Sequence, residues 1–201
     1  MPSDLTRRRM IAGMGAAMAV AILPRGAAAL STQEASGLIS SLVGEINTVI
    51  NSGRSEGAMY ADFERIFVRY ADVATIARFV LGPTARSLNS AQFASYQRAF
   101  QGYIARKYGR RFREFIGGRI TVRGAQPVKG NYLVTGTADL RGEQPFDVSF
   151  LVSDRSGRTL FVDMMIEGVS LLKSEAVEVR AMLDRAGGSV DLLTAALGKA
   201  G

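Results

Sequence analysis

The sequence contains no cysteine, no histidine and no tryptophan. A chain without cysteine forms no disulfide, no thiolate metal site and no cysteine-linked lipid anchor. A chain without histidine lacks the commonest general base and the commonest metal ligand. These absences weigh against hydrolase triads and zinc sites, and they do not exclude an enzyme that uses carboxylate or lysine chemistry.

The composition is that of a folded protein with a mildly basic surface. Apolar residues make up 47% of the chain, which is too many for a disordered protein. The net charge is +7, and about +4 of it remains after residue 29. A charge of this size suits an anionic membrane surface or an acidic partner and does not require nucleic acid.

The first 29 residues have the pattern of an export signal. Arg7, Arg8 and Arg9 precede a short apolar run from Met10 to Leu23, and the small residues Ala27–Ala29 follow it. The run is too short and too rich in glycine and alanine for a membrane-spanning helix. We predict a signal peptide over residues 1–29, of either the twin-arginine or the general secretory kind, and a single domain over residues 30–201.

Hydrophobic periodicity predicts an α+β domain in the order helices, strands, helices. Helical spacing covers residues 31–50, 58–70, 72–81 and 89–115, and it returns over residues 170–183 and 189–197. Alternating patterns between residues 120 and 167 predict four antiparallel strands joined as a meander of hairpins. In the last strand Leu160, Val162, Met164 and Ile166 are expected inward, and Phe161 and Asp163 outward.

A curved four-stranded sheet covered by amphipathic helices encloses an apolar interior, which is either a filled core or a pocket for an apolar ligand. The long helix from residue 89 adds a stripe of aromatic residues to that interior. If the interior is open, we expect these residues to line it: Leu81, Tyr96, Phe100, Tyr103, Val134, Phe146, Val148, Phe150, Val162, Met164, Ile166 and Val169.

Two sets of charged residues are further candidates. The basic residues Arg106, Lys107 and Arg110 near the end of the long helix, together with Arg78 and Arg86, either stabilise exposed helix ends or form a surface for phosphate headgroups or an acidic partner. Asp163 and Glu167, at the end of the fourth strand, either make hydrogen bonds to the following turn or act as acid–base groups. No metal-ligand cluster and no phosphate-binding glycine loop occurs in the sequence.

Two segments of the chain resemble the MlaC family, also called the toluene-tolerance auxiliary family. The more specific segment is Phe161–Leu171, with the run Ile166-Glu167-Gly168-Val169-Ser170, and the other is Asp72–Gly82. The chain departs from the family pattern at Thr159-Leu160, where a tryptophan is frequent, and at Lys173-Ser174-Glu175, where an Asn-Tyr-Arg step is frequent.

The resemblance implies a cone like that of nuclear transport factors, with an apolar pocket. It implies a periplasmic phospholipid carrier that moves lipid between an outer-membrane lipoprotein complex and an inner-membrane ABC transporter complex. It also implies no catalytic residue, no metal and no cofactor, and we expect a monomer. Two alternatives stay open: an enzyme on the same cone that uses Asp163 or Glu167, and a protein-binding adaptor with a filled core.

Overall fold

The computed structural model describes residues 30–111 and 116–201. The predicted signal peptide and residues 112–115, at the end of the predicted long helix, lie outside the described residues. Within them, a run of helices is followed by an antiparallel sheet and two closing helices, which confirms the α+β class.

The leading helices begin and end where their capping residues place them. Helix α1 (Thr32–Ile50) starts at a capping box in which Ser31 and Glu34 bond each other's backbone N–H groups. Helix α2 (Glu56–Tyr70) follows, and Asp72 caps α3 (Val73–Leu81), which ends at Gly82. The short 3₁₀ helix η1 (Gly82–Arg86) then leads into α4 (Ser90–Arg111), the longest helix among the described residues.

The sheet contains five strands, not the predicted four, in the simple order β1-β2-β3-β4-β5. They are β1 (Arg119–Val128), β2 (Asn131–Asp139), β3 (Phe146–Ser153), β4 (Leu160–Ile166) and β5 (Val169–Ser170). The additional strand is two residues long, because a tight turn with positive φ at Glu167 and Gly168 returns the chain onto β4. A pair of residues is too short to show the alternation by which a strand is recognised.

A bulge in β4 corrects the predicted facing of Phe161. The register pairs Val152 with Phe161 and Leu151 with Asp163, so that Val162 is the extra residue. Phe161 therefore turns inward, where its ring lies 5.9 Å from that of Phe150 and 6.3 Å from that of Phe67.

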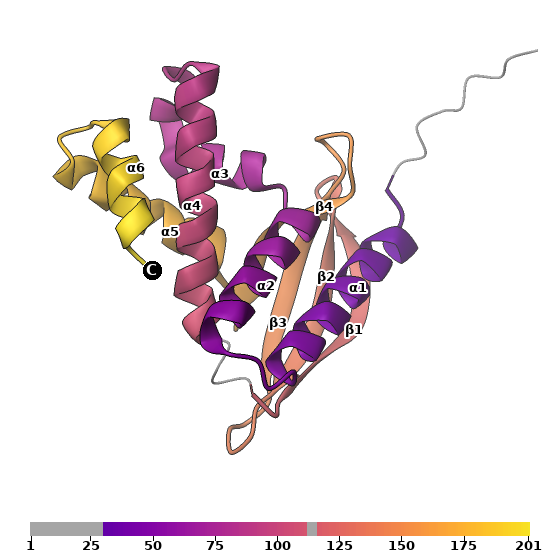
Figure 1. Cartoon of the computed structure of the whole chain (residues 1–201). Coiled ribbons are helices and arrows are strands. Elements are labelled where there is room, and N and C mark those ends of the chain that lie inside the picture. The colour runs from indigo at the N-terminus through magenta and orange to yellow at the C-terminus, as the bar shows by residue number, and fades with distance from the viewer. Residues whose placement is uncertain (1–29, 112–115) are drawn as a thin grey trace, which may run out of the picture.

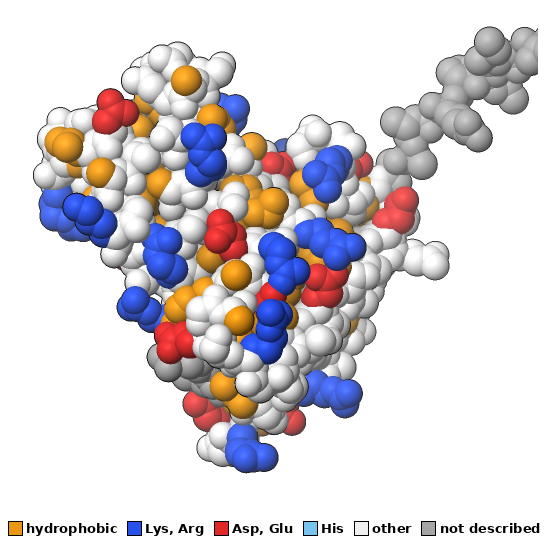
Figure 2. Space-filling model, viewed as in Figure 1, with side chains coloured by type: hydrophobic (Ala, Val, Ile, Leu, Met, Phe, Trp, Pro, Cys, Tyr) orange, Lys and Arg blue, Asp and Glu red, His pale blue; other side chains and the backbone are white. Residues whose placement is uncertain are grey.

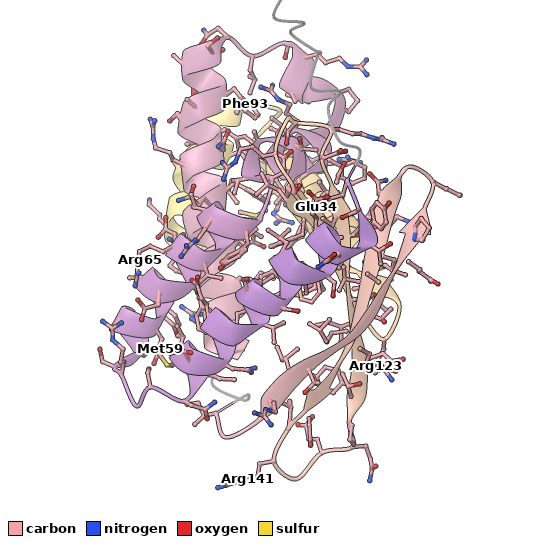
Figure 3. All side chains as sticks on the ribbon, turned by 90° about the vertical axis from the view of Figure 1, so that its right-hand side faces the viewer. Glu34, Met59, Arg65, Phe93, Arg123 and Arg141 are labelled. Carbon is pink, nitrogen blue, oxygen red and sulfur yellow. The ribbon has the colours of Figure 1, made fainter. Side chains whose placement is uncertain are left out.

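The helices cover one face of the sheet and leave the other open (Figures 1 and 3). Helices α1 and α2 lie across the strands, whereas α3, α4, α5 (Leu171–Arg185) and α6 (Val190–Lys199) gather beyond one edge of the sheet (Figure 1). The side chain of Arg123, an exposed residue of β1, pairs with Asp147 on β3. The core consequently lies between the helices and the inner face of β2, β3 and β4.

Gly136 allows β1 and β2 to approach closely. A Cβ atom at this position would lie 2.7 Å from the backbone oxygen of Thr121, a distance that requires a strand to move. We expect Gly136→Ala to lower the free energy of unfolding by about 1–3 kcal/mol, the usual cost of overpacking. Urea titration measures the change, and Gly124→Ala on β1 is the control because a Cβ there meets nothing within 4 Å. Equal losses in the two variants would contradict the explanation.

Candidate lipid-binding cavity

An apolar cavity of about 120 Å³ lies between the sheet and helices α1, α2 and α4. It is larger than the space that one water molecule needs, and it is close in size to an engineered apolar cavity of roughly 150 Å³ that stays dry and binds benzene. On the face drawn in Figure 2, hydrophobic side chains gather in the hollow between the part that carries α3 and α4 and the part that carries α1 and α2. An interior space therefore exists, and its chemistry suits an apolar guest.

The cavity wall is assembled from helices and strands that are far apart in the sequence. The helices α1 and α2 contribute aliphatic and aromatic side chains from their buried faces, and α4 contributes two of its aromatic side chains, Phe100 and Tyr108. The wall residues from these elements and from α3 are Leu42, Ile46, Phe63, Ile66, Phe67, Ile76, Phe100, Ile104, Ala105, Tyr108 and Gly109. Those from β3, β4 and the start of α5 are Phe150, Phe161, Val162, Asp163, Met164, Leu171, Leu172 and Glu175.

Four of the twelve residues that the sequence predicted to line the interior lie on this wall: Phe100, Phe150, Val162 and Met164. The other eight lie elsewhere. Leu81, Tyr96, Tyr103, Val134 and Val148 are buried in the packed core, and Phe146 and Ile166 pack against that core while partly exposed. Val169 is 60% exposed because it belongs to the turn and the short strand β5.

Sequence reasoning missed the contribution of α1 and α2 to the wall. Leu42, Ile46, Phe63 and Ile66 are on the apolar faces of their helices, so their burial followed from the spacing. Which buried residues border a cavity depends on how the helices cross the sheet, and that information is not present in the periodicity.

The predicted basic surface divides into exposed and internally bonded residues. Arg78, Arg86 and Arg110 are exposed, and Arg78 stacks its guanidinium 3.8 Å from the ring centroid of Phe93. Arg106 instead donates to the carbonyl oxygens of Leu197 and Ala200 at the end of α6. Lys107 is also bonded internally, so a docking role is now expected chiefly of the exposed arginines.

Lys107 lies at the centre of a polar cluster between α4 and α5. Its Nζ donates to Glu175 Oε1 at 2.7 Å, to the Tyr103 hydroxyl at 3.0 Å and to Glu178. The Tyr108 hydroxyl donates to the same Glu175 oxygen at 2.6 Å, and the Tyr103 hydroxyl donates to Glu178 at 2.9 Å. Burial, together with the nearby carboxylates, raises the pKa of Tyr103 and keeps its hydroxyl neutral.

Glu178 connects the stability of this cluster to pH. The hydrogen bond from Lys107 lowers the pKa of Glu178 below its ordinary value of 4.5. A lowered folded-state pKa stabilises the protein above pH 4.5, and the contribution disappears as the pH falls through the folded-state value. We therefore expect Glu178→Gln to cost more unfolding free energy at pH 7 than at pH 3. Urea titrations of both proteins at the two pH values measure this, and an equal cost at both would contradict it.

The two carboxylates considered for acid–base chemistry are bonded to the protein. Asp163 accepts hydrogen bonds from the Ser170 hydroxyl at 2.6 Å and from the backbone N–H of Leu172 at 3.0 Å. Glu167 accepts one from the backbone N–H of Asp147. Asp163 thus bonds to the segment that follows it, as the structural alternative predicted, whereas the partner of Glu167 lies on β3 and not in the following turn. Among residues 30–111 and 116–201, no group of acidic side chains is arranged to hold a metal ion.

No helix of the described segments is long and apolar enough to cross a membrane. A comparison with curated proteins finds no match. Among solved structures, a phospholipid-binding protein from Ralstonia solanacearum, determined in complex with a phospholipid, superposes with a TM-score of 0.70. The alignment has 16% sequence identity and covers 82% of this chain and 95% of the other, so it shows a common fold.

The family model for the MlaC protein matches residues 40–199, which span every described helix and strand except the first turns of α1. The segments Asp72–Gly82 and Phe161–Leu171, on which the resemblance was based, both lie inside the match. The second of them supplies part of the cavity wall and the turn held by Asp163. The chain belongs to the MlaC family.

Proposed function

We propose that this protein is a periplasmic phospholipid carrier and that the cavity holds the acyl chains. The observation that carries the proposal is an apolar cavity between helices and sheet in a member of the MlaC family. The fold shared with the phospholipid-bound protein from Ralstonia solanacearum supports it. The internal bonding of Asp163 and Glu167 favours a carrier over an acid–base enzyme.

The energetics of lipid transfer explain why such a cavity is useful. Each acyl CH₂ group in water costs about 0.8 kcal/mol, so two chains cost on the order of 20 kcal/mol. A lipid that leaves a bilayer therefore needs another apolar environment throughout its passage. The cavity wall offers this, because its polar groups are confined to Asp163, Tyr108 and Glu175 and the rest is aliphatic or aromatic.

Loading requires the cavity to widen. At about 120 Å³ it lies below the roughly 300–1,000 Å³ of pockets that enclose drug-sized ligands. The wall is formed by helices on one side and by β3 and β4 on the other, so separation of the helices from the sheet enlarges it. A partner or membrane that binds the open form better then controls uptake and release.

The proposed passage runs between an outer-membrane lipoprotein complex and an inner-membrane ABC transporter complex of the Mla type, with the carrier as a monomer. The exposed arginines Arg78, Arg86 and Arg110 are our candidates for contact with headgroups or acidic partners. Their positive charge suits both, and the effect of removing it should weaken as salt is raised.

Export also predicts which residue begins the mature protein and which side chain its new ammonium group contacts. Cleavage after Ala29 leaves an ammonium group on Leu30, whose nitrogen lies 3.3 Å from Asp154 Oδ2. Leu30 itself is buried. We expect the exported protein to begin at Leu30 and to lose up to about 1 kcal/mol of stability in Asp154→Asn, as a partly exposed ion pair would. N-terminal sequencing and urea titration check the two expectations, and a start within the helix α1 would contradict the first.

Native mass spectrometry of the purified mature protein tests the proposed function. We expect a population whose added mass equals that of a phospholipid, together with matching phospholipid in an organic extract of the same sample. A protein that stays free of phospholipid after incubation with phospholipid vesicles, while remaining folded, would overturn the proposal.

A further inference from the structure

The cavity wall contains one polar atom without a partner. Glu175, on α5, lines the cavity, and its side chain is 4% exposed. Its Oε1 accepts from both Lys107 and Tyr108, whereas Oε2 is buried and has no hydrogen-bond partner among the described residues. An unpaired buried acceptor destabilises the folded protein, more so when it is charged, and so calls for an explanation.

The cluster around this atom cannot supply a donor to it from Lys107. An ammonium has three N–H donors, and those of Lys107 are directed to Glu175 Oε1, Tyr103 and Glu178. Tyr103 and Tyr108 direct their hydroxyl protons to the same carboxylates. Glu175 Oε2 is therefore free to accept a hydrogen bond from a molecule in the cavity that Glu175 lines.

The charges of the cluster indicate what kind of donor fits. Among the described residues, Lys107 brings one positive charge against the two carboxylates of Glu175 and Glu178, and Arg185 adds its attraction to Glu178, which is 49% exposed. The interior end of the cluster thus carries an excess of negative charge. A cationic N–H donor meets both requirements, and charge-assisted hydrogen bonds are about twice as strong as neutral ones.

We propose that Glu175 Oε2 is a headgroup-recognition site that accepts a hydrogen bond from the primary ammonium of an aminophospholipid. This inference rests on the proposed function, which supplies the lipid. The cluster spans from the half-exposed Glu178 through Lys107, which is 22% exposed, to the buried Glu175. The ammonium binds at the inner end of this series as the cavity widens, and the acyl chains lie along the apolar wall.

The test compares lipids that differ only in the methylation of the headgroup nitrogen. Mature protein is incubated with vesicles of equimolar ethanolamine and choline phospholipids with identical acyl chains, and the bound lipids are quantified after re-isolation. We expect about tenfold enrichment of the ethanolamine lipid, the ratio that a charge-assisted hydrogen bond supplies. Vesicles with N,N-dimethylethanolamine lipid in place of the ethanolamine lipid should show enrichment as well, because one N–H remains at the same charge.

Two variants of similar shape locate the effect. In Glu175→Gln the amide oxygen takes the place of Oε1 as the acceptor for Lys107 and Tyr108, so the NH₂ group takes the place of Oε2. An acceptor is thereby replaced by a donor, and the enrichment of the ethanolamine lipid should disappear. Glu178→Gln changes a carboxylate of the same cluster, both of whose oxygens already have partners, and should keep the enrichment.

The outcomes separate this inference from the proposed function. Headgroup recognition by Glu175 is overturned if the wild-type protein binds the two lipids in the same ratio as the vesicles contain them. It is also overturned if both variants lose enrichment equally. Either result leaves the carrier proposal standing. If enrichment declines gradually with each methyl group added to the headgroup nitrogen, and does not drop only at the third, headgroup recognition by Glu175 is also overturned. No lipid bound from any vesicle overturns the proposed function itself. The wild-type comparison decides the matter even if Glu175→Gln fails to fold.

Discussion

Met164→Glu should reduce phospholipid loading at least tenfold while the protein remains folded. Met164 lines the cavity and is only partly buried, so the new carboxylate enters the space that we propose for the acyl chains. Acyl chains beside an unpaired carboxylate would have to desolvate it, at a cost of several kcal/mol. Lipid extraction after incubation with vesicles measures the loading, and circular dichroism and urea titration measure the fold.

The neighbouring methionine is a matched control for this variant. Met165 lies on the same strand and is also partly buried, but it faces the other side of the sheet and does not line the cavity. Met165→Glu should load lipid normally. Loss of loading in both variants, or normal loading in Met164→Glu, would contradict the placement of the acyl chains.

Val148→Glu should behave differently from Met164→Glu, although the sequence pattern gives the two positions the same role. Val148 is buried in the packed core and does not border the cavity. A carboxylate there has neither space nor partner, and such substitutions are among those that unfold marginally stable domains.

Lys107→Met should lower the free energy of unfolding by about 3 kcal/mol. Lys107 is the lysine bonded to Glu175 and Glu178, and its removal leaves the Glu175 carboxylate, 4% exposed, with the Tyr108 hydroxyl as its one donor among the described residues. Loss of one member of a buried ion pair costs roughly 3–5 kcal/mol, and the 22% exposure of Lys107 places the effect at the lower end. Urea titration at pH 7 measures the change.

A second substitution shows whether the unpaired charge is the cause. In the double variant Lys107→Met/Glu175→Met the buried carboxylate is gone, so most of the lost stability should return. Lys173→Met is the control, because Lys173 is an exposed lysine of α5, the helix that carries Glu175 and Glu178. A double variant as unstable as the sum of its single changes would show that packing of the Lys107 side chain, and not the charge, matters.

Local signals predicted most of the fold. Helical spacing over residues 31–50 and 72–81 predicted α1 and α3, and the ends of these helices at Ser31, Asp72 and Gly82 are set by neighbouring residues. The period-two segments likewise predicted β2, β3 and β4 and their order. These features depend on interactions within a few residues, which a sequence shows directly.

The errors arose where a feature depends on contacts between distant segments. The β4 bulge at Val162 is defined only by pairing with β3, so alternation alone placed Phe161 on the wrong face. Lys107 was interpreted as part of an exposed basic helix end because its partners are on α5, 68 and 71 positions later. Glu175 attracted no attention, since a single acidic residue in an amphipathic helix is ordinarily solvated.

Photo-crosslinking with a phospholipid that carries a diazirine on an acyl chain tests the central claim most directly. After loading, irradiation and digestion, we expect the label on peptides that contain Phe100, Phe150 and Met164. A peptide that contains the solvent-exposed Val177 of α5 but no cavity residue should carry no label. Label confined to exterior positions such as Val177, with the peptides of the cavity wall unmodified, would contradict the claim that the interior holds the acyl chains.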